Sequence, residues 1–301
     1  MRDGRFKALS TILATAQNAQ ILAIVLLKDY KIRKLRPCTN LMSTKDRSSL
    51  IRLSQGQLNL LTICPPKFQQ IYLEQLHSPP NPEQQEKQTW GTRFHLLMQQ
   101  RELGLPLESL LAAEPELHRS LAALIQAAPE ILLPANSDRR EAEHCRTLSF
   151  NNYLLTVIYD LLIVNKETAQ ILDWKTYLQP PNKKKLANNW QTRLYMYVLA
   201  ETSDYLPEQI SFTYWFVKLP HQPQSLTFNY NSQQHQQTKQ DLAELLKQLD
   251  QWLNNYRATG VSFPHRVNCE TNCPYYRLFS NIKENQGKIP KSITEIEEIS
   301  I

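Results

Sequence analysis

The sequence predicts an α/β protein whose central mixed β-sheet is flanked by helices, and three observations lead to this fold class. Helical patterns fill residues 54–128, a β-hairpin follows between Tyr153 and Lys175, and strands then alternate with helices. This order is typical of a sheet covered by helices. The chain has 301 residues, of which 42% are hydrophobic, so we expect one domain with an ample core plus added helices.

The first part of the chain is predicted to be helical. We expect a helix over about residues 54–77, a proline-rich linker at 79–82, a helix at 90–101 and further helix from Leu107 to Ala128. The linker is assigned from its prolines, which lack the backbone N–H that a helix interior needs.

The hairpin has the clearest pattern in the chain. Its first strand, Tyr153–Val164, is rich in β-branched and aromatic residues and contains neither Gly nor Pro. A polar turn at 165–168 precedes the second strand, which ends at Asp173-Trp174-Lys175. Side chains alternate along a strand, so Asp173 and Lys175 point to the same face. Asp160 reaches that face from the first strand if the register allows.

Charged side chains on an otherwise apolar hairpin are costly unless something compensates their charge. A bound cation between Asp160 and Asp173 would do so. A surface hairpin in which Asp173 pairs with a lysine explains the same residues, because the D-x-K spacing is common. The spacing alone leaves both readings open.

A helix is predicted after the hairpin, from Leu186 to Ala200. Gln191 and Tyr195 lie one turn apart on it and therefore share a face. They could present an amide and a phenol near the hairpin acids, or they could form an ordinary polar side. Beyond this helix we expect strands at 210–219 and 225–230, then a long helix at 234–257 that Gly260 ends.

These residues together resemble a known nuclease family. Asp160 near the end of a long strand, then Asp173-Trp174-Lys175-Thr176, then Gln191 and Tyr195 resemble motifs II and III and the following helix motif of the RecB/AddB-type branch of the PD-(D/E)xK nuclease superfamily. The resemblance covers about residues 50–280. It implies a restriction-endonuclease-like core with a central mixed β-sheet.

Upstream segments extend the resemblance. Trp90–Leu97 is similar to motif I of that branch, in which a G-x-x-x-H helix supplies a histidine ligand. Leu53–Leu58, followed by Cys64 and Phe68, is similar to the segment that opens these domains. Glu143 stands where the family often has a glutamate ahead of the motif II strand. Each motif alone is weak, but their common order is specific.

The resemblance implies roles for the site residues. His95, Asp160 and Asp173 would bind Mg²⁺ or Mn²⁺ together with the backbone carbonyl of Trp174, in the oxygen-rich coordination that hard cations prefer. Lys175 would orient the attacking water and stabilise charge on the phosphate, while the metal polarises the phosphate and lowers the pKa of its bound water.

The family roles also extend to DNA contacts. Gln191 and Tyr195 would position the DNA backbone or the acids of the metal site. The basic run Lys183, Lys184 and Lys185 stands beside the metal motif, where it could contact phosphates. On its own such a run is more often a solvated loop.

The cysteines depart from the family pattern. Many RecB/AddB-type nucleases hold an iron–sulfur cluster with one leading Cys and a trailing C-x₂-C-x₅-C. Here Cys64 fits the leading position, but Cys269 and Cys273 are separated by three residues and Phe279 occupies the last position. Four thiolates are usually required. Neither Cys38 nor Cys145 is placed to substitute, so we expect the cluster to be lost and these cysteines to be relics or a zinc or labile site.

The net charge of +6 does not indicate nucleic-acid binding by the body of the chain. The first 40 residues hold eight Lys and Arg against two Asp, which accounts for the whole surplus. A sequence pI of about 9.0 therefore reflects this segment. Only a local basic patch could contact phosphates.

Three regions are predicted along the chain. Residues 1–45 would be a basic N-terminal extension, either a disordered arm or an over-long start with Met42 just ahead of the domain. Residues 46–280 would form the nuclease domain and 281–301 a loose tail. The apolar run Ile21–Leu27 is too short to span a bilayer.

The predicted function is a metal-dependent DNA nuclease that hydrolyses phosphodiester bonds in DNA repair, recombination or processing. No G-x-x-x-x-G-K-[ST] motif is present, so a helicase or ATPase partner would be a separate protein. Five cysteines, an odd number without regular pairing, argue against a disulfide framework and favour the cytoplasm. The alternatives are a catalytically inactive nuclease-fold subunit that binds DNA or acts as a scaffold, and an unrelated α/β domain with chance motifs.

Overall fold

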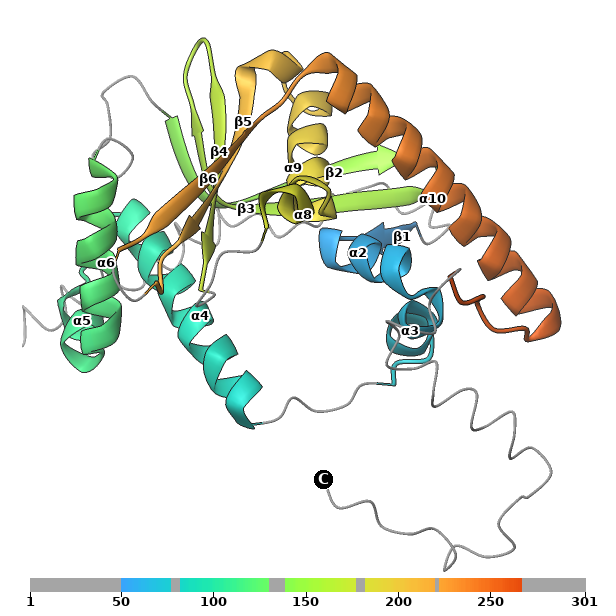
Figure 1. The fold of residues 1–301 in the computed structure, drawn as a ribbon, viewed down its shortest axis with the longest axis horizontal. Coiled ribbons are helices and arrows are strands. Elements are labelled where there is room, and N and C mark those ends of the chain that lie inside the picture. The colour runs from blue at the N-terminus through green and yellow to red at the C-terminus, as the bar shows by residue number, and fades with distance from the viewer. Residues whose placement is uncertain (1–49, 77–81, 130–138, 177–181, 220–221, 267–301) are drawn as a thin grey trace, which may run out of the picture. The chain divides into compact units, whose positions relative to one another are not determined.

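The computed structural model describes residues 50–76, 82–129, 139–176, 182–219 and 222–266 (Figure 1). The elements are, in chain order, β1 (Ile51–Leu53), α2 (Gln55–Ile63), α3 (Pro65–Phe68), a π-helix (Gln69–Leu73), α4 (Pro82–Glu102), α5 (Glu108–Ala113), α6 (Pro115–Ala127), β2 (Arg139–Phe150), β3 (Tyr153–Val164), β4 (Ala169–Lys175), α8 (Lys183–Ala187), α9 (Trp190–Glu201), a 3₁₀ helix (Pro207–Gln209), β5 (Ile210–Phe216), β6 (Gln224–Asn229) and α10 (Ser232–Thr259). The predicted regions 1–45 and 281–301 lie outside these residues, so their character stays a prediction.

The strands form one mixed sheet in the order β1-β3-β4-β5-β6, and β2 pairs with β3. β1 runs parallel to β3 and β4 parallel to β5, while β2 with β3, β3 with β4 and β5 with β6 are antiparallel pairs. Helices lie on both sides of the sheet (Figure 1). The predicted α/β fold class, a central mixed sheet flanked by helices, is confirmed.

Two hydrophobic cores cover the two faces of the sheet. One packs side chains of β1, β3 and β5 against α2, α9 and α10. The other packs α4 and α6 against Leu172 and Trp174 of β4 and Trp215 of β5. Because neighbouring residues of β4 alternate between the two faces, Asp173 and Lys175 face the side that carries α9.

The predicted hairpin is present as β3 and β4. Leu161 pairs with Leu172 and Val164 with Ala169. The turn is closed by Asn165, whose backbone N–H donates to the Thr168 carbonyl at 3.0 Å and whose side chain accepts from the Thr168 N–H at 2.8 Å. An Asx side chain that bonds the backbone ahead of it is a standard way to build such a turn.

The structure departs from the predicted helices where proline or asparagine interrupts them. Pro65 and Pro66 break the expected helix 54–77 into α2 and α3, and Pro115 separates α5 from α6. The helix expected from Leu186 begins at Trp190, because the Asn189 side chain accepts from the Gln191 N–H at 2.8 Å and caps α9. α10 ends as predicted at Gly260, whose φ of 72° is left-handed.

Two strands were not predicted. β1 is only three residues long, and β2 begins Arg-Arg-Glu-Ala-Glu-His-Cys-Arg, which lacks the apolar alternation of a half-buried strand. β2 is held by its long antiparallel pairing with β3, from Arg139 with Val164 to Phe150 with Tyr153. Tertiary pairing overrides local propensity here.

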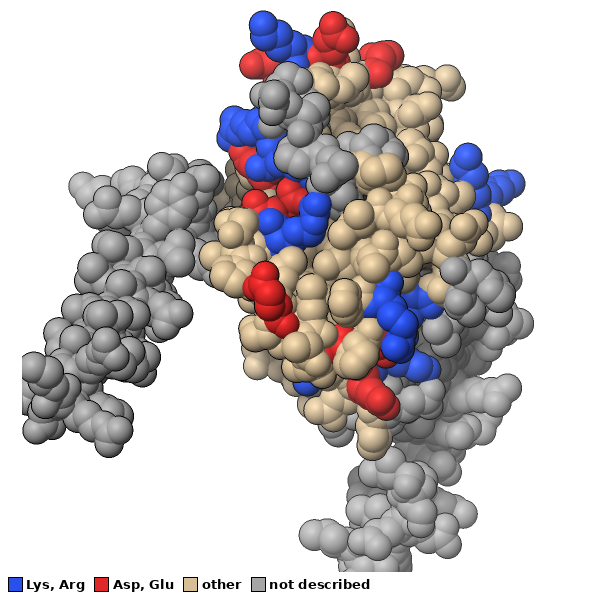
Figure 2. All heavy atoms as spheres, turned by 90° about the vertical axis from the view of Figure 1, so that its left-hand side faces the viewer, with Lys and Arg blue, Asp and Glu red and all other residues tan. Residues whose placement is uncertain are grey.

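The charge distribution agrees with a body that is nearly neutral overall. On the face shown in Figure 2, basic and acidic side chains are intermixed and do not form one extended basic surface. Within the described parts of the chain, no helix combines the length and the apolar character needed to cross a membrane.

Candidate active site

Three acidic residues occupy the same level on three adjacent strands. In the β2–β3 ladder Ala142 pairs with Leu161 and His144 with Tyr159, so Glu143 stands opposite Asp160. The β3–β4 ladder ends where Leu161 pairs with Leu172, and Asp160 and Asp173 are the next residues on the two strands. The register that the hairpin pattern left open therefore brings these carboxylates together.

The backbone of Glu143 is unusual for the middle of a strand. Its φ is 50°, in the left-handed region that residues other than glycine seldom occupy. Such a conformation costs on the order of 1–3 kcal/mol and is found mostly where a site requires it. The Glu143–Asp160 position is also missing from the otherwise continuous ladder. The distorted backbone lies where the Glu143 side chain lines the cleft.

Helix α4 brings His95 to this row. Its Nδ1 lies 3.3 Å from Asp160 Oδ1 and its Nε2 lies 3.0 Å from the Trp174 carbonyl oxygen. The other oxygen of Asp160 accepts from the Trp174 N–H at 2.7 Å. Gly91, one turn before His95, permits this approach, because a Cβ there would lie 3.2 Å from Thr176 Oγ1.

Two side chains, Lys175 and Gln191, contact the Asp173 carboxylate. Lys175 Nζ lies 2.6 Å from Asp173 Oδ1, and Gln191 Nε2 donates to Asp173 Oδ2 at 2.5 Å. The Lys175 ammonium also lies 5.4 Å from the centre of the Tyr214 ring. Tyr195 is buried, and its ring packs edge-on against Tyr159 at 5.4 Å. Gln191 therefore contacts an acid of the site directly, whereas the Tyr195 ring is largely part of the core.

These side chains line one open cleft of about 740 Å³. The cleft contains the side chains of His95, Glu143, Asp160, Asp173, Lys175, Gln191 and Tyr195. The N-terminus of α2 contributes Ser54 and Gln55 to one wall, and α4 contributes Thr92, Leu96 and Gln99 to another. The structure thus gathers the predicted catalytic side chains in a space open to a large substrate.

The basic run stands beside this cleft rather than inside it. Lys183, Lys184 and Lys185 are exposed on the short helix α8, which precedes α9. Lys183 Nζ lies 5.9 Å from the centre of the Phe228 ring, and Lys185 lines a neighbouring groove. Their proposed contacts with DNA would therefore be made at the rim.

The residues fit a divalent cation. Ligand atoms of His95, Glu143 and Asp160 all lie within 4.8 Å of one another. The Trp174 carbonyl adjoins this cluster through its contact with His95. Carboxylate and carbonyl oxygens suit Mg²⁺ and Mn²⁺. Asp173, which the resemblance placed among the ligands, is engaged by Lys175 and Gln191 and stands outside this cluster of three.

The titration of the site reflects a surplus of negative charge. Burial alone would lower the pKa of His95, but its hydrogen bond to Asp160 and the nearby carboxylates raise this pKa to about 9. Burial and the charge of Asp160 raise the pKa of Glu143 to about 7. The same two causes raise the pKa of Asp173 above its usual range, against the opposing effect of Lys175. A bound cation would relieve this surplus.

Glu143 is the functional residue whose importance the sequence understated. Its place ahead of the hairpin was visible, but its nearness to Asp160 depends on the pairing of β2 with β3, which no local pattern in β2 indicates. The signal that could have found it is the spacing from Glu143 to Asp160 across a tight turn at Asn151.

The cysteine predictions are mostly outside the described residues. Cys64 is buried after α2, while Cys269, Cys273 and Phe279 lie beyond residue 266, where the description ends. The loss of an iron–sulfur cluster therefore stays a prediction. Cys145 on β2 is disulfide-bonded, and the expectation that the chain lacks a disulfide framework stays a prediction.

Comparison with known proteins places this site in a family. A model described as the PD-(D/E)XK nuclease superfamily matches residues 52–278. No curated protein matches the chain. The solved structures that resemble it include a candidate exonuclease from Eubacterium rectale, with a TM-score of 0.48 and 10% identity over 79% of this chain and 92% of that one. Another is SSO0001, with a TM-score of 0.31 and 12% identity over 75% of this chain and 86% of the other.

The family match spans most of the chain, from β1 to beyond α10, and includes every residue that lines the cleft. The (D/E)XK pattern in the family's name is matched by Asp173-Trp174-Lys175, in which Lys175 Nζ lies 2.6 Å from Asp173 Oδ1. The chain belongs to the PD-(D/E)XK nuclease superfamily.

Proposed function

We propose that this protein is a metal-dependent DNA nuclease of the RecB/AddB type that hydrolyses phosphodiester bonds. The observation that carries the proposal is one open cleft in which an imidazole, a row of three carboxylates and a lysine converge. Work in DNA repair, recombination or processing with a separate helicase, in the cytoplasm, is part of the same proposal.

We assign the metal to His95, Glu143 and Asp160, with the Trp174 carbonyl and Asp173 as further oxygen donors. A bound Mg²⁺ or Mn²⁺ would polarise the scissile phosphate and lower the pKa of a water molecule. Gln191 keeps Asp173 oriented through its 2.5 Å hydrogen bond. The Trp174 N–H fixes Asp160 in the same way at 2.7 Å, so both acids are held before a substrate arrives.

Lys175 is assigned to the phosphate itself. Its ammonium is held between Asp173 and the Tyr214 ring, and the side chain lines the cleft beside the acidic residues. A cation in this place can orient the attacking water and offset the negative charge that develops on the phosphate oxygens. The exposed lysines of α8 would contact phosphates further along the strand.

Cleavage of linear DNA tests the proposal. We expect the purified chain to degrade linear DNA with Mg²⁺ or Mn²⁺, and to stop when EDTA removes the metal, because the acidic row cannot hold a phosphate without a cation. The products are followed on a denaturing gel. Binding of DNA without cleavage in either metal would favour the alternative of an inactive nuclease-fold subunit.

Metal affinity is expected to rise with pH. Without metal the pKa of Glu143 is about 7 and that of His95 about 9, so both carry protons at acidic pH. A ligand must lose its proton to bind, so affinity should increase between about pH 6 and 9, by at most about tenfold per pH unit for each proton released. Isothermal titration with Mn²⁺ across this range measures it.

Glu143→Gln supplies the matched control for this pH dependence. The variant keeps the shape of the side chain but removes the proton that titrates near pH 7. It should therefore lose the lower part of the pH dependence and retain the part that belongs to His95. A Mn²⁺ affinity that is independent of pH in the wild-type protein would contradict the ligand assignment.

A further inference from the structure

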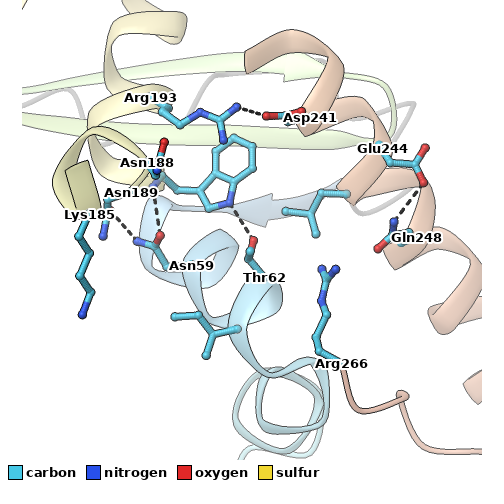
Figure 3. A pocket seen from close by; sticks show the side chains of 13 residues that line it. Asn59, Thr62, Lys185, Asn188, Asn189, Arg193, Asp241, Glu244, Gln248 and Arg266 are labelled. Carbon is cyan, nitrogen blue, oxygen red and sulfur yellow. Dashed lines mark hydrogen bonds and ion pairs between the residues drawn. The ribbon is translucent and has the colours of Figure 1, made fainter. Parts of the chain in front are cut away.

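A second groove of about 520 Å³ lies beside the catalytic cleft, between α2, the α8–α9 junction and α10. Figure 3 shows the side chains that line it. Amide and charged side chains, among them Asn188, Lys185, Arg193, Arg266, Asp241 and Glu244, line it together with the apolar side chains of Ile63, Trp190 and Leu245. The proposed reaction at the cleft leaves this groove without a role.

The groove and the cleft share two helices. On α2, Gln55 lines the cleft and Asn59, one turn later, lines the groove. At the start of α9, Gln191 lines the cleft and its neighbour Trp190 lines the groove. The cleft and the groove are therefore neighbours along these two helices.

The wall between them is held by a hydrogen-bonded set of side chains. Asn59 Nδ2 donates to Asn189 Oδ1 at 2.9 Å, and Asn59 Oδ1 accepts from the Trp190 backbone N–H at 3.0 Å (Figure 3). The Trp190 indole N–H donates to Thr62 Oγ1 at 2.8 Å. Because these partners bind each other, the wall is preformed and its shape does not depend on a ligand.

The charges of the groove are not equally available. Arg193 is paired with Asp241 at 2.5 Å and lies 4.6 Å from the centre of the Trp190 ring. Glu244 accepts from Gln248 at 3.0 Å but keeps its negative charge. Among the described residues, Lys185 makes no ion pair, and the Arg266 guanidinium, whose Nε is buried without a hydrogen-bond partner, lies 5.9 Å from the centre of the Trp252 ring. In Figure 3 the Arg266 guanidinium points into the groove.

We propose that this groove binds the phosphodiester backbone of the same DNA strand, away from the scissile bond. The inference rests on the proposed nuclease function and adds a second subsite to it. Lys185 and Arg266 would contact phosphates, and the exposed amide of Asn188 would contact sugars or bases. Arg193 is already neutralised by Asp241, so its part is to support the wall.

The first test compares variants that remove a positive charge from the groove with one that removes a negative charge. Binding of a long single-stranded oligonucleotide is measured by fluorescence anisotropy, with Ca²⁺ in place of Mg²⁺. Arg266→Gln and Lys185→Gln should each raise the Kd roughly three- to fivefold, as expected for exposed ion pairs. Glu244→Gln should lower the Kd, because it removes a repulsive charge from the same groove. Each lost phosphate contact should also reduce the salt dependence of log Kd by about 0.7.

Lys247→Gln is the matched control. Lys247 is exposed on α10, next to Gln248, but does not line the groove. This variant should bind the oligonucleotide as the wild-type protein does. Equal weakening by Lys247→Gln would indicate a general effect of net charge, and weaker binding by Glu244→Gln would show that this carboxylate does not repel the strand. Either result would overturn the proposal.

Substrate length gives the second test and separates this inference from the proposed function. Thymidine 5′-p-nitrophenyl phosphate is too small to extend from the metal site into the groove. Arg266→Gln should therefore lower kcat/KM far more for the long oligonucleotide than for this ester, mainly through KM. An equal loss on both substrates would overturn the subsite. If the wild-type protein cleaves neither substrate but the signed binding pattern holds, the nuclease proposal fails and the DNA groove stands.

Discussion

Asp160→Asn and Asp173→Asn are each expected to abolish cleavage of linear DNA, with losses of roughly 10³-fold or more, since residues of a catalytic unit act together. Asn keeps the shape of the side chain and an oxygen that can accept the hydrogen bond from the Trp174 N–H or from Gln191. It removes the negative charge that a divalent cation needs. Single-turnover assays with Mg²⁺ measure the loss.

The two variants should differ in metal binding. Asp160 belongs to the cluster with His95 and Glu143, so Asp160→Asn should weaken Mn²⁺ binding strongly. Asp173 is engaged by Lys175, so Asp173→Asn should weaken Mn²⁺ binding less and release the lysine. This difference would separate the role of a direct ligand from that of an acid that also positions Lys175.

Asp250→Asn is the control for both. Asp250 accepts from the Tyr153 hydroxyl at 2.6 Å and does not line the cleft. Its neutralisation should leave the cleavage rate at the wild-type level. If Asp160→Asn or Asp173→Asn cuts as fast as this control, the site is misassigned.

The hairpin was predictable because its determinants are local. Tyr153–Val164 is an unbroken β-forming run, and the alternation of side chains along the next strand places Asp173 and Lys175 on one face whatever the rest of the chain does. The turn at Asn165 is also determined locally, because the Asn165 side chain accepts from the Thr168 N–H three residues later. Local sequence patterns were therefore enough to predict the part of the site that the hairpin carries, Asp173 and Lys175.

The other half depends on contacts between distant segments. Glu143 becomes a neighbour of Asp160 only through the register of β2 with β3, and the charged sequence of β2 conceals that it is a strand. His95 reaches Asp160 only because α4 packs closely at Gly91. A sequence pattern cannot fix a register or a helix position that tertiary packing decides.

Lys175→Met is expected to lose chemistry while retaining the binding of metal and DNA. Methionine keeps the aliphatic chain beside Tyr214 but removes the ammonium that lies 2.6 Å from Asp173 Oδ1. A charge that acts on the transition state commonly contributes about 10²–10³ in rate. The single-turnover rate should fall by this factor, whereas the Kd values for Mn²⁺ and for an oligonucleotide should change little.

The pH of this measurement matters, because Lys175 holds down the pKa of Asp173. Loss of the lysine should raise that pKa, so at acidic pH the variant would also lose activity through protonation of Asp173. Assays at alkaline pH, where the Asp173 carboxyl is ionised, isolate the role of the ammonium. Lys166→Met, at the exposed turn of the same hairpin, removes an equal charge and should cleave normally. If Lys175→Met matches Lys166→Met in single-turnover rate, Lys175 only braces Asp173 and another group must act on the phosphate.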